Sequence, residues 1–163
     1  SAVATELYAH IAPAPNERTA RKLGWAGQLH EIGCQISHSD HHRHGAYILG
    51  NTDAPGFALP ELQWLSLMVL GHRGKLRKLD AAIAVPELAL PLMALRLAIQ
   101  LCHARRTPEL SGLTLSYDSK NTACQLQITH AWASAYPQSV RLLEQEVLAW
   151  SKTPWSLELQ RLP

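Results

Sequence analysis

The sequence predicts a mainly α fold, in which a helical bundle is followed by a small ββαβ unit of the α+β class. Apolar residues recur at helical spacing through roughly the first hundred positions, whereas strict alternation appears only after Thr107 and Pro108. With 163 residues, 47% of them apolar, the chain can build a substantial core. We therefore predict a helical domain at residues 1–108 and a small α+β domain at residues 109–163.

Five helices are expected before this boundary. We place them over residues 2–10, 16–31, 40–50, 60–75 and 87–106. A proline-containing turn at residues 13–15 ends the first, and Asn16 is a suitable N-cap for the second. In the fifth, we expect Pro91 in the first turn, where a missing N–H costs little, and Arg105 and Arg106 in the last turn.

A β-hairpin, a helix and a further strand are expected after the boundary. Apolar residues alternate over residues 113–117 and 126–128, and the sequence DSKNT between them is typical of a turn. Val140 and Leu143 begin a helical stripe that continues through residue 150. Alternation returns at residues 155–159. A helix that covers one face of a small sheet would bury both patterns.

Composition excludes several classes of protein. The net charge is only +2, and we interpret the five tryptophans as core or interface residues, so we expect no nucleic-acid partner. No run of eighteen apolar residues occurs, and the N-terminal sequence does not resemble a signal peptide. Cys34, Cys102 and Cys124 are scattered and odd in number, which favours a reducing compartment. We therefore expect a cytoplasmic protein without a transmembrane segment.

Histidines are concentrated in residues 29–49, LHEIGCQISHSDHHRHGAYIL. Five of the nine histidines fall in this stretch, which also contains Glu31: His30, His38, His41, His42 and His44. Such a cluster indicates a metal site, an anion site or the remnant of one. A helix that begins near Asp40 would offer free N–H groups to an anion, and Arg43 and His44 could add charge-assisted hydrogen bonds. A solvated loop and helix start is the alternative.

A second basic segment follows at residues 72–78. It contains five residues that can carry positive charge, with no acidic residue before Asp80: His72, Arg73, Lys75, Arg77 and Lys78. A run of charge is often only a solvated face. A line of cations could also follow a polyphosphate chain without reading any sequence, with a steep dependence on salt.

Four short segments of the sequence resemble a known family. LHEIG, ISHSDHHRHGAYIL, NTDAPGF and GHRGKL occur in the order and spacing of the C-terminal half of exopolyphosphatases of the Ppx/GppA phosphatase family. The resemblance implies an HD-like helical bundle, a small α+β domain and contacts in a homodimer. It also implies a parent enzyme that releases terminal phosphate from inorganic polyphosphate, or acts on guanosine pentaphosphate. Its Mg2+ would be bound in an N-terminal catalytic region with glycine-rich phosphate loops, which this sequence lacks.

The resemblance also implies that an ancestral metal site has been lost. His30 and Glu31 occupy the place of the His-Asp pair of HD enzymes, and Ile99 occupies the place of their distant Asp. Since a catalytic metal site needs three or more protein ligands, we expect no metal, no cofactor and no catalytic residue in this chain.

Together these observations predict a region that binds inorganic polyphosphate and forms a homodimer but does not hydrolyse its ligand. The residues predicted to bind polyphosphate combine the two basic segments: His38, Arg43, His44, Arg73, Lys75, Arg77 and Lys78. Two alternatives stay open. One is a metal-dependent HD-type phosphohydrolase, and the other is a purely structural dimerisation module.

Overall fold

A computed structural model describes residues 1–14 and 16–163. Its helices are α1 (Ala2–Ile11), α2 (Glu17–Leu29), α3 (His41–Asn51), α4 (Leu59–Gly71), α5 (Pro86–Leu101), α6 (His130–Ala135) and α7 (Pro137–Trp150). Its strands are β1 (Leu113–Asp118), β2 (Ala123–Thr129) and β3 (Ser156–Leu162). Three short 3-10 helices are η1 (Ile32–Gln35), η2 (Leu76–Leu79) and η3 (Ala82–Ala84). The turn predicted at residues 13–15 includes Pro15, which lies outside the described residues.

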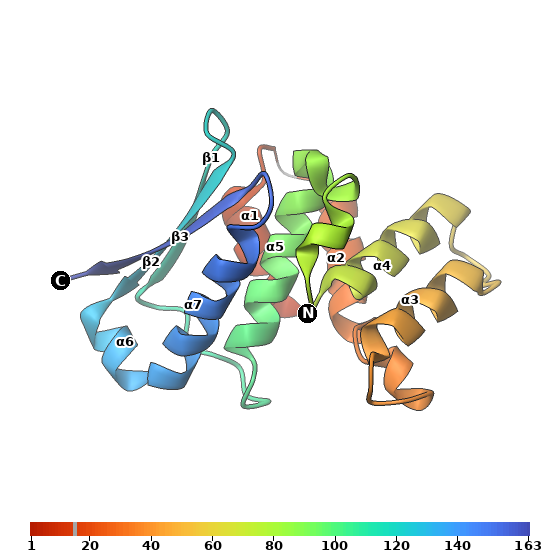
Figure 1. Ribbon diagram of the computed structural model, residues 1–163, viewed down its shortest axis with the longest axis horizontal. Helices are drawn as coiled ribbons and strands as arrows, with labels where there is room; N and C mark the ends of the chain where they lie inside the picture. Colours follow the sequence, from red (N-terminus) through yellow and green to blue (C-terminus); the bar gives the residue numbers. More distant parts are fainter. Residues whose placement is uncertain (15) are drawn as a thin grey trace.

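The three strands form one sheet in the order β1-β2-β3 (Figure 1). The predicted hairpin is confirmed, because β1 pairs antiparallel with β2 and places Leu115 opposite Leu126. β3 pairs parallel with β2, so that Leu126 also faces Leu159. A parallel neighbour requires a crossover, and helices α6 and α7 supply it. The mainly α fold with a small α+β part is thereby confirmed.

Helix α5 is the centre of the molecule (Figure 1). Helix α1 packs against both α5 and β1, and α7 packs against both α5 and β3. Helices α3 and α4 lie side by side at the opposite end from the sheet. Buried apolar side chains from α1 through β3 form one continuous cluster, which therefore crosses residue 108. The division of the chain into two domains stays a prediction.

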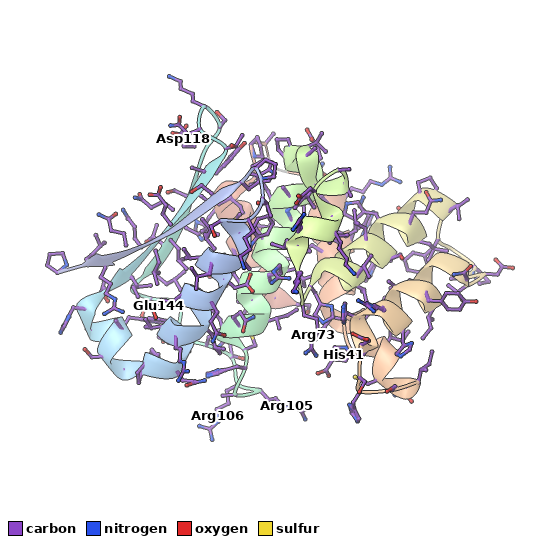
Figure 2. All side chains as sticks on the ribbon, in the orientation of Figure 1. His41, Arg73, Arg105, Arg106, Asp118 and Glu144 are labelled. Atoms are coloured by element: carbon purple, nitrogen blue, oxygen red, sulfur yellow. The ribbon has the colours of Figure 1, made fainter. Side chains whose placement is uncertain are left out.

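The predicted start of α5 agrees with the structure to within one residue, but the predicted place of Pro91 and the predicted end of the helix are wrong. The helix begins at Pro86, so Pro91 lies inside it rather than in its first turn. A proline there removes one helical hydrogen bond, but the residue is buried in the core, where packing offsets this loss. The helix ends at Leu101, and Arg105 has a left-handed backbone (φ 55°) in the following loop. Arg105 and Arg106 extend from that loop (Figure 2) and do not cap the helix.

None of the helices in the described part of the chain is long and apolar enough to cross a membrane.

Candidate anion-binding site

The start of α3 is held against η1. A Cβ atom added to Gly33 would overlap the backbone oxygen of His41, so only glycine permits this close approach. Asp40 precedes the helix with a left-handed backbone (φ 53°), and its side chain makes no capping hydrogen bond. Its carboxylate instead lies 3.6 Å from the guanidinium of Arg43, and both side chains are exposed. The first turn of α3 is therefore fixed by backbone packing rather than by a side-chain cap.

The second basic segment forms a turn whose backbone is held by hydrogen bonds from Arg96. Helix α4 ends at Gly71, and Gly74 takes a positive φ of 78° that allows the chain to reverse before η2. The buried guanidinium of Arg96 donates to the carbonyl oxygen of Gly71 at 2.7 Å and to that of Gly74 at 3.3 Å. These contacts fix the backbone that carries Arg73 and Lys75.

The two basic segments meet, although they are some thirty residues apart in sequence. Arg73 donates a hydrogen bond of 2.7 Å from Nη1 to Nε2 of His41 (Figure 2). Because an arginine can only donate, His41 Nε2 is the acceptor, and its proton is on Nδ1. That Nδ1 atom is buried and finds no hydrogen-bond partner among the described residues. The neutral form of His41 thus holds the Arg73 side chain over the start of α3.

Between these segments lies a cavity of about 400 Å³, which we call the basic pocket. Its lining combines residues of both segments with two leucines: Asp40, His42, Arg43, Leu70, Arg73, Gly74, Lys75, Lys78 and Leu79. Four of the lining residues are exposed cations, whereas Asp40 is the one carboxylate that the described residues contribute to this lining. Excess positive charge in a concave surface attracts anions.

The structure separates the seven residues predicted to bind polyphosphate. Arg43, Arg73, Lys75 and Lys78 line the basic pocket. Arg77 points to a different cavity on the other side of η2. The exposed His38 and the half-buried His44 are not among the residues that line either cavity. His42 also lines the basic pocket. It was not among the seven residues predicted to bind polyphosphate, although it belongs to the histidine cluster and lies in the first turn of α3.

Four imidazoles lie close together next to the basic pocket, and one of them, His42, lines it. Ring centroids of His72 lie 5.3 Å from those of His30 and His41, and 6.3 Å from that of His42. His72 is only 2% exposed and donates from Nδ1 to the carbonyl oxygen of Val69 at 2.6 Å. Burial lowers the pKa of His72 to about 3. His72 is therefore neutral at physiological pH and adds no positive charge to the second basic segment.

The pKa values of His41 and His42 are also lowered. Burial is the main cause for both residues, and the guanidinium of Arg73 is the next. Positive charge in the basic pocket at neutral pH therefore comes from arginine and lysine. The imidazole of His42 contributes hydrogen-bonding capacity, and its Nδ1 is buried without a partner among the described residues.

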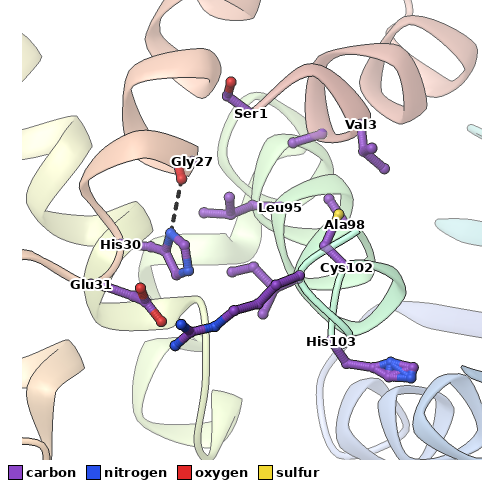
Figure 3. Close-up of a pocket in the computed structure, with 12 residues that line it drawn as sticks. Ser1, Val3, Gly27, His30, Glu31, Leu95, Ala98, Cys102 and His103 are labelled. Atoms are coloured by element: carbon purple, nitrogen blue, oxygen red, sulfur yellow. Dashed lines mark hydrogen bonds between the residues drawn. The ribbon is translucent and has the colours of Figure 1, made fainter. Parts of the chain in front are cut away.

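His30 and Glu31, which the resemblance relates to the His-Asp pair of HD enzymes, line a separate cavity of about 440 Å³ (Figure 3). His30 donates from Nδ1 to the carbonyl oxygen of Gly27 at 2.8 Å, and Glu31 is exposed. Ile99 lines the same cavity, so an apolar side chain stands where the resemblance implies a carboxylate ligand. Among the described residues, no three His, Cys, Asp or Glu side chains are grouped so that they could hold a metal ion. That this chain binds no metal stays a prediction.

Comparison with known proteins agrees with the resemblance in the sequence. A family model described as Ppx/GppA phosphatase, domain III, matches residues 2–148. A guanosine-5'-triphosphate,3'-diphosphate pyrophosphatase of Pseudoalteromonas translucida (strain TAC 125) is 35% identical over 133 residues, which cover 80% of this chain. A protein of the same name from Aliivibrio fischeri (strain ATCC 700601 / ES114) is 33% identical over 134 residues, or 81% of the chain.

The chain spans only part of these relatives. The matched residues make up 26% of the length of the Pseudoalteromonas protein and 27% of that of the Aliivibrio protein. Since the family model nevertheless covers most of the chain, this protein belongs to the Ppx/GppA phosphatase family.

Proposed function

We propose that this chain binds inorganic polyphosphate in the basic pocket and does not hydrolyse it. The contact between Arg73 and His41 carries this proposal, because it brings the histidine-rich segment and the second basic segment to one concave surface. Arg43, Arg73, Lys75 and Lys78 would pair with phosphate oxygens, and His42 would add a hydrogen bond.

Polyphosphate fits the chemistry of this pocket better than a ligand that needs specific recognition. The pocket offers exposed arginine and lysine side chains, which suit a ligand that repeats the same anionic group along its length. Binding of this kind releases counterions and weakens steeply as salt rises. Near the pocket, the buried imidazole of His72 is neutral, which avoids the cost of burying a further charge.

In a longer enzyme of this family, the proposed role is to keep the substrate attached between cleavages. We propose that the parent enzyme, a cytoplasmic homodimer, releases terminal phosphate from polyphosphate with water and Mg2+. That Mg2+ would be bound in a region other than this chain. The basic pocket would then influence the affinity for long substrates rather than the rate of bond cleavage.

A second candidate substrate of the parent is guanosine pentaphosphate. The two relatives described above are named for action on guanosine-5'-triphosphate,3'-diphosphate. Its phosphate groups would pair with the same cations. Competition between this nucleotide and polyphosphate for the chain distinguishes the two ligands.

The first test removes two cations that line the basic pocket. We expect Arg73→Gln combined with Lys78→Gln to weaken polyphosphate binding about tenfold at low salt. The slope of log affinity against log salt should fall by about 1.4, since each lost phosphate contact removes about 0.7 from that slope. Lys120→Gln is the control, because Lys120 is exposed and its backbone N–H donates to Asp118 in the hairpin turn. Asp118 lies far from Arg73 (Figure 2). Equal affinities for the double variant and the wild type would refute the proposal.

Two further measurements address the alternatives. Phosphate release from polyphosphate and nucleotides in the presence of Mg2+ or Mn2+ should be undetectable with the purified chain. Turnover that depends on metal and disappears in His30→Ala would instead identify a metal-dependent phosphohydrolase. Light scattering after size exclusion tests the homodimer. A dimer without salt-sensitive binding of polyphosphate would support a purely structural dimerisation module.

A further inference from the structure

A second basic cavity lies on the other side of the 74–77 turn. It measures about 370 Å³ and is formed by this turn and the C-terminal end of α7, and we call it the α7 pocket. Its cations are Lys75, Arg77 and Lys152, all of them exposed. In the described part of the chain, no carboxylate lines this cavity. Gln145, the polar residue that α7 contributes to the lining, is uncharged. Its electrostatic preference is therefore for an anion.

The α7 pocket and the basic pocket share a wall. Gly74 and Lys75 line both cavities, whereas Lys78 lines only the basic pocket and Arg77 only the α7 pocket. The 3-10 helix η2 produces this division, because consecutive residues on a helix point in different directions. Cations are thus arranged from Arg43 on α3, across the turn, to Lys152 after α7.

The shared wall is held rigidly between the two cavities. Arg96 donates to the backbone oxygens of Gly71 and Gly74, and its guanidinium is itself paired with Glu146 of α7 at 2.8 Å. Arg96 and Glu146 are each 3% exposed. The same buried pair therefore fixes both the turn and the helix that form the α7 pocket, so the spacing of the two cavities is set by the core.

We infer that the α7 pocket is a second subsite for a linear polyphosphate chain, which crosses the 74–77 turn from the basic pocket. This inference rests on the proposed function of the basic pocket. A long chain would contact both cavities at once, and the second contact gains from the effective concentration created by the first. A short phosphate chain, such as tripolyphosphate or the phosphates of a nucleotide, would occupy one cavity only. Lys152 and Arg77 would thus select for long polyphosphate.

The experiment compares ligand lengths in the whole chain. The affinities of the wild type, Arg77→Gln combined with Lys152→Gln, and the control Lys120→Gln are measured for long-chain polyphosphate and for tripolyphosphate at the same low salt. We expect the double variant to bind long-chain polyphosphate about fivefold more weakly and tripolyphosphate with unchanged affinity. Lys120→Gln should bind both ligands as the wild type does. Since all three positions are exposed, unfolding temperatures should agree closely.

Each other outcome has a definite meaning. If the variant lost affinity equally for both lengths, or for neither, the second subsite would be disproved. In that case Arg73→Gln with Lys78→Gln would still weaken binding, which leaves the proposed function intact. If the wild type bound neither ligand in a salt-sensitive way, the proposed function and this inference would fail together.

Discussion

The charge of His72 depends on its burial rather than on its position in the second basic segment. Unfolded histidine has a pKa near 6.5, whereas burial lowers that of His72 to about 3 in the folded protein. Between these values the unfolded chain binds a proton that the folded chain does not. The free energy of unfolding therefore decreases as pH falls through this window, by up to about 1.4 kcal/mol per pH unit from this residue.

We predict that His72→Asn reduces this pH dependence. Asparagine keeps a side-chain N–H for the carbonyl oxygen of Val69 but cannot titrate. Urea unfolding at pH 4, 5 and 6 should show a shallower decrease in the free energy of unfolding than in the wild type. Between pH 7.5 and 8.5, where histidine is neutral in both states, the two proteins should have parallel profiles. Identical slopes in the acidic range would mean that His72 titrates normally in the folded protein.

Individual residues show where sequence reasoning reaches its limit. Tyr47, Ile48 and Leu49 form a short apolar run in α3, and such a run predicts a buried core segment; Leu49 is indeed buried. Tyr47, however, is 69% exposed, so the expectation that it is buried is wrong. Periodicity indicates which residues share a helix face, but the neighbouring elements decide which face is covered.

At the scale of elements, the buried pair of Arg96 and Glu146 joins α5 to α7 with two hydrogen bonds of 2.8 Å. We predict that Glu146→Leu, which leaves the guanidinium of Arg96 buried and unpaired, lowers the free energy of unfolding by about 3–5 kcal/mol. The double variant Arg96→Met with Glu146→Leu should be more stable than the sum of the two single changes implies, because neither charge is left alone. Chemical denaturation of the four proteins measures this coupling.

An exposed ion pair provides the control for this cycle. Arg161 and Glu144 lie 2.9 Å apart, with side chains 59% and 52% exposed. Arg161→Gln should change the free energy of unfolding by less than about 1 kcal/mol. Strictly additive effects at Arg96 and Glu146 would show that the buried pair does not act as a unit.

Elements were predictable where their signal is local. The N-cap at Asn16 is confirmed, since its side chain accepts from the N–H of Thr19 at 3.0 Å. The helix α6 and the parallel pairing of β3 were not foreseen. Both depend on how the chain returns to the sheet, and alternation of apolar residues is the same for parallel and antiparallel neighbours.

At the scale of the whole molecule, two buried contacts connect the helical part to the α+β part. Besides the pair of Arg96 and Glu146, Trp155 donates from Nε1 to the carbonyl oxygen of Ile83 at 2.7 Å. With a continuous apolar core, these contacts predict one cooperative unfolding transition. The calorimetric and van't Hoff enthalpies should agree, and far-UV circular dichroism should follow the heat absorption. Two separate transitions would instead support independent domains at residues 1–108 and 109–163.

The sequence by itself determined the family, the mainly α class, the hairpin and the two basic segments, because each depends on local pattern or on residues close in the chain. Only the tertiary structure decided that the segments meet through Arg73 and His41, that His72 is buried and neutral, and that Arg77 and Lys78 face different cavities. The physical reason is that side-chain charge and direction depend on burial and on packing between distant elements, which no local pattern encodes.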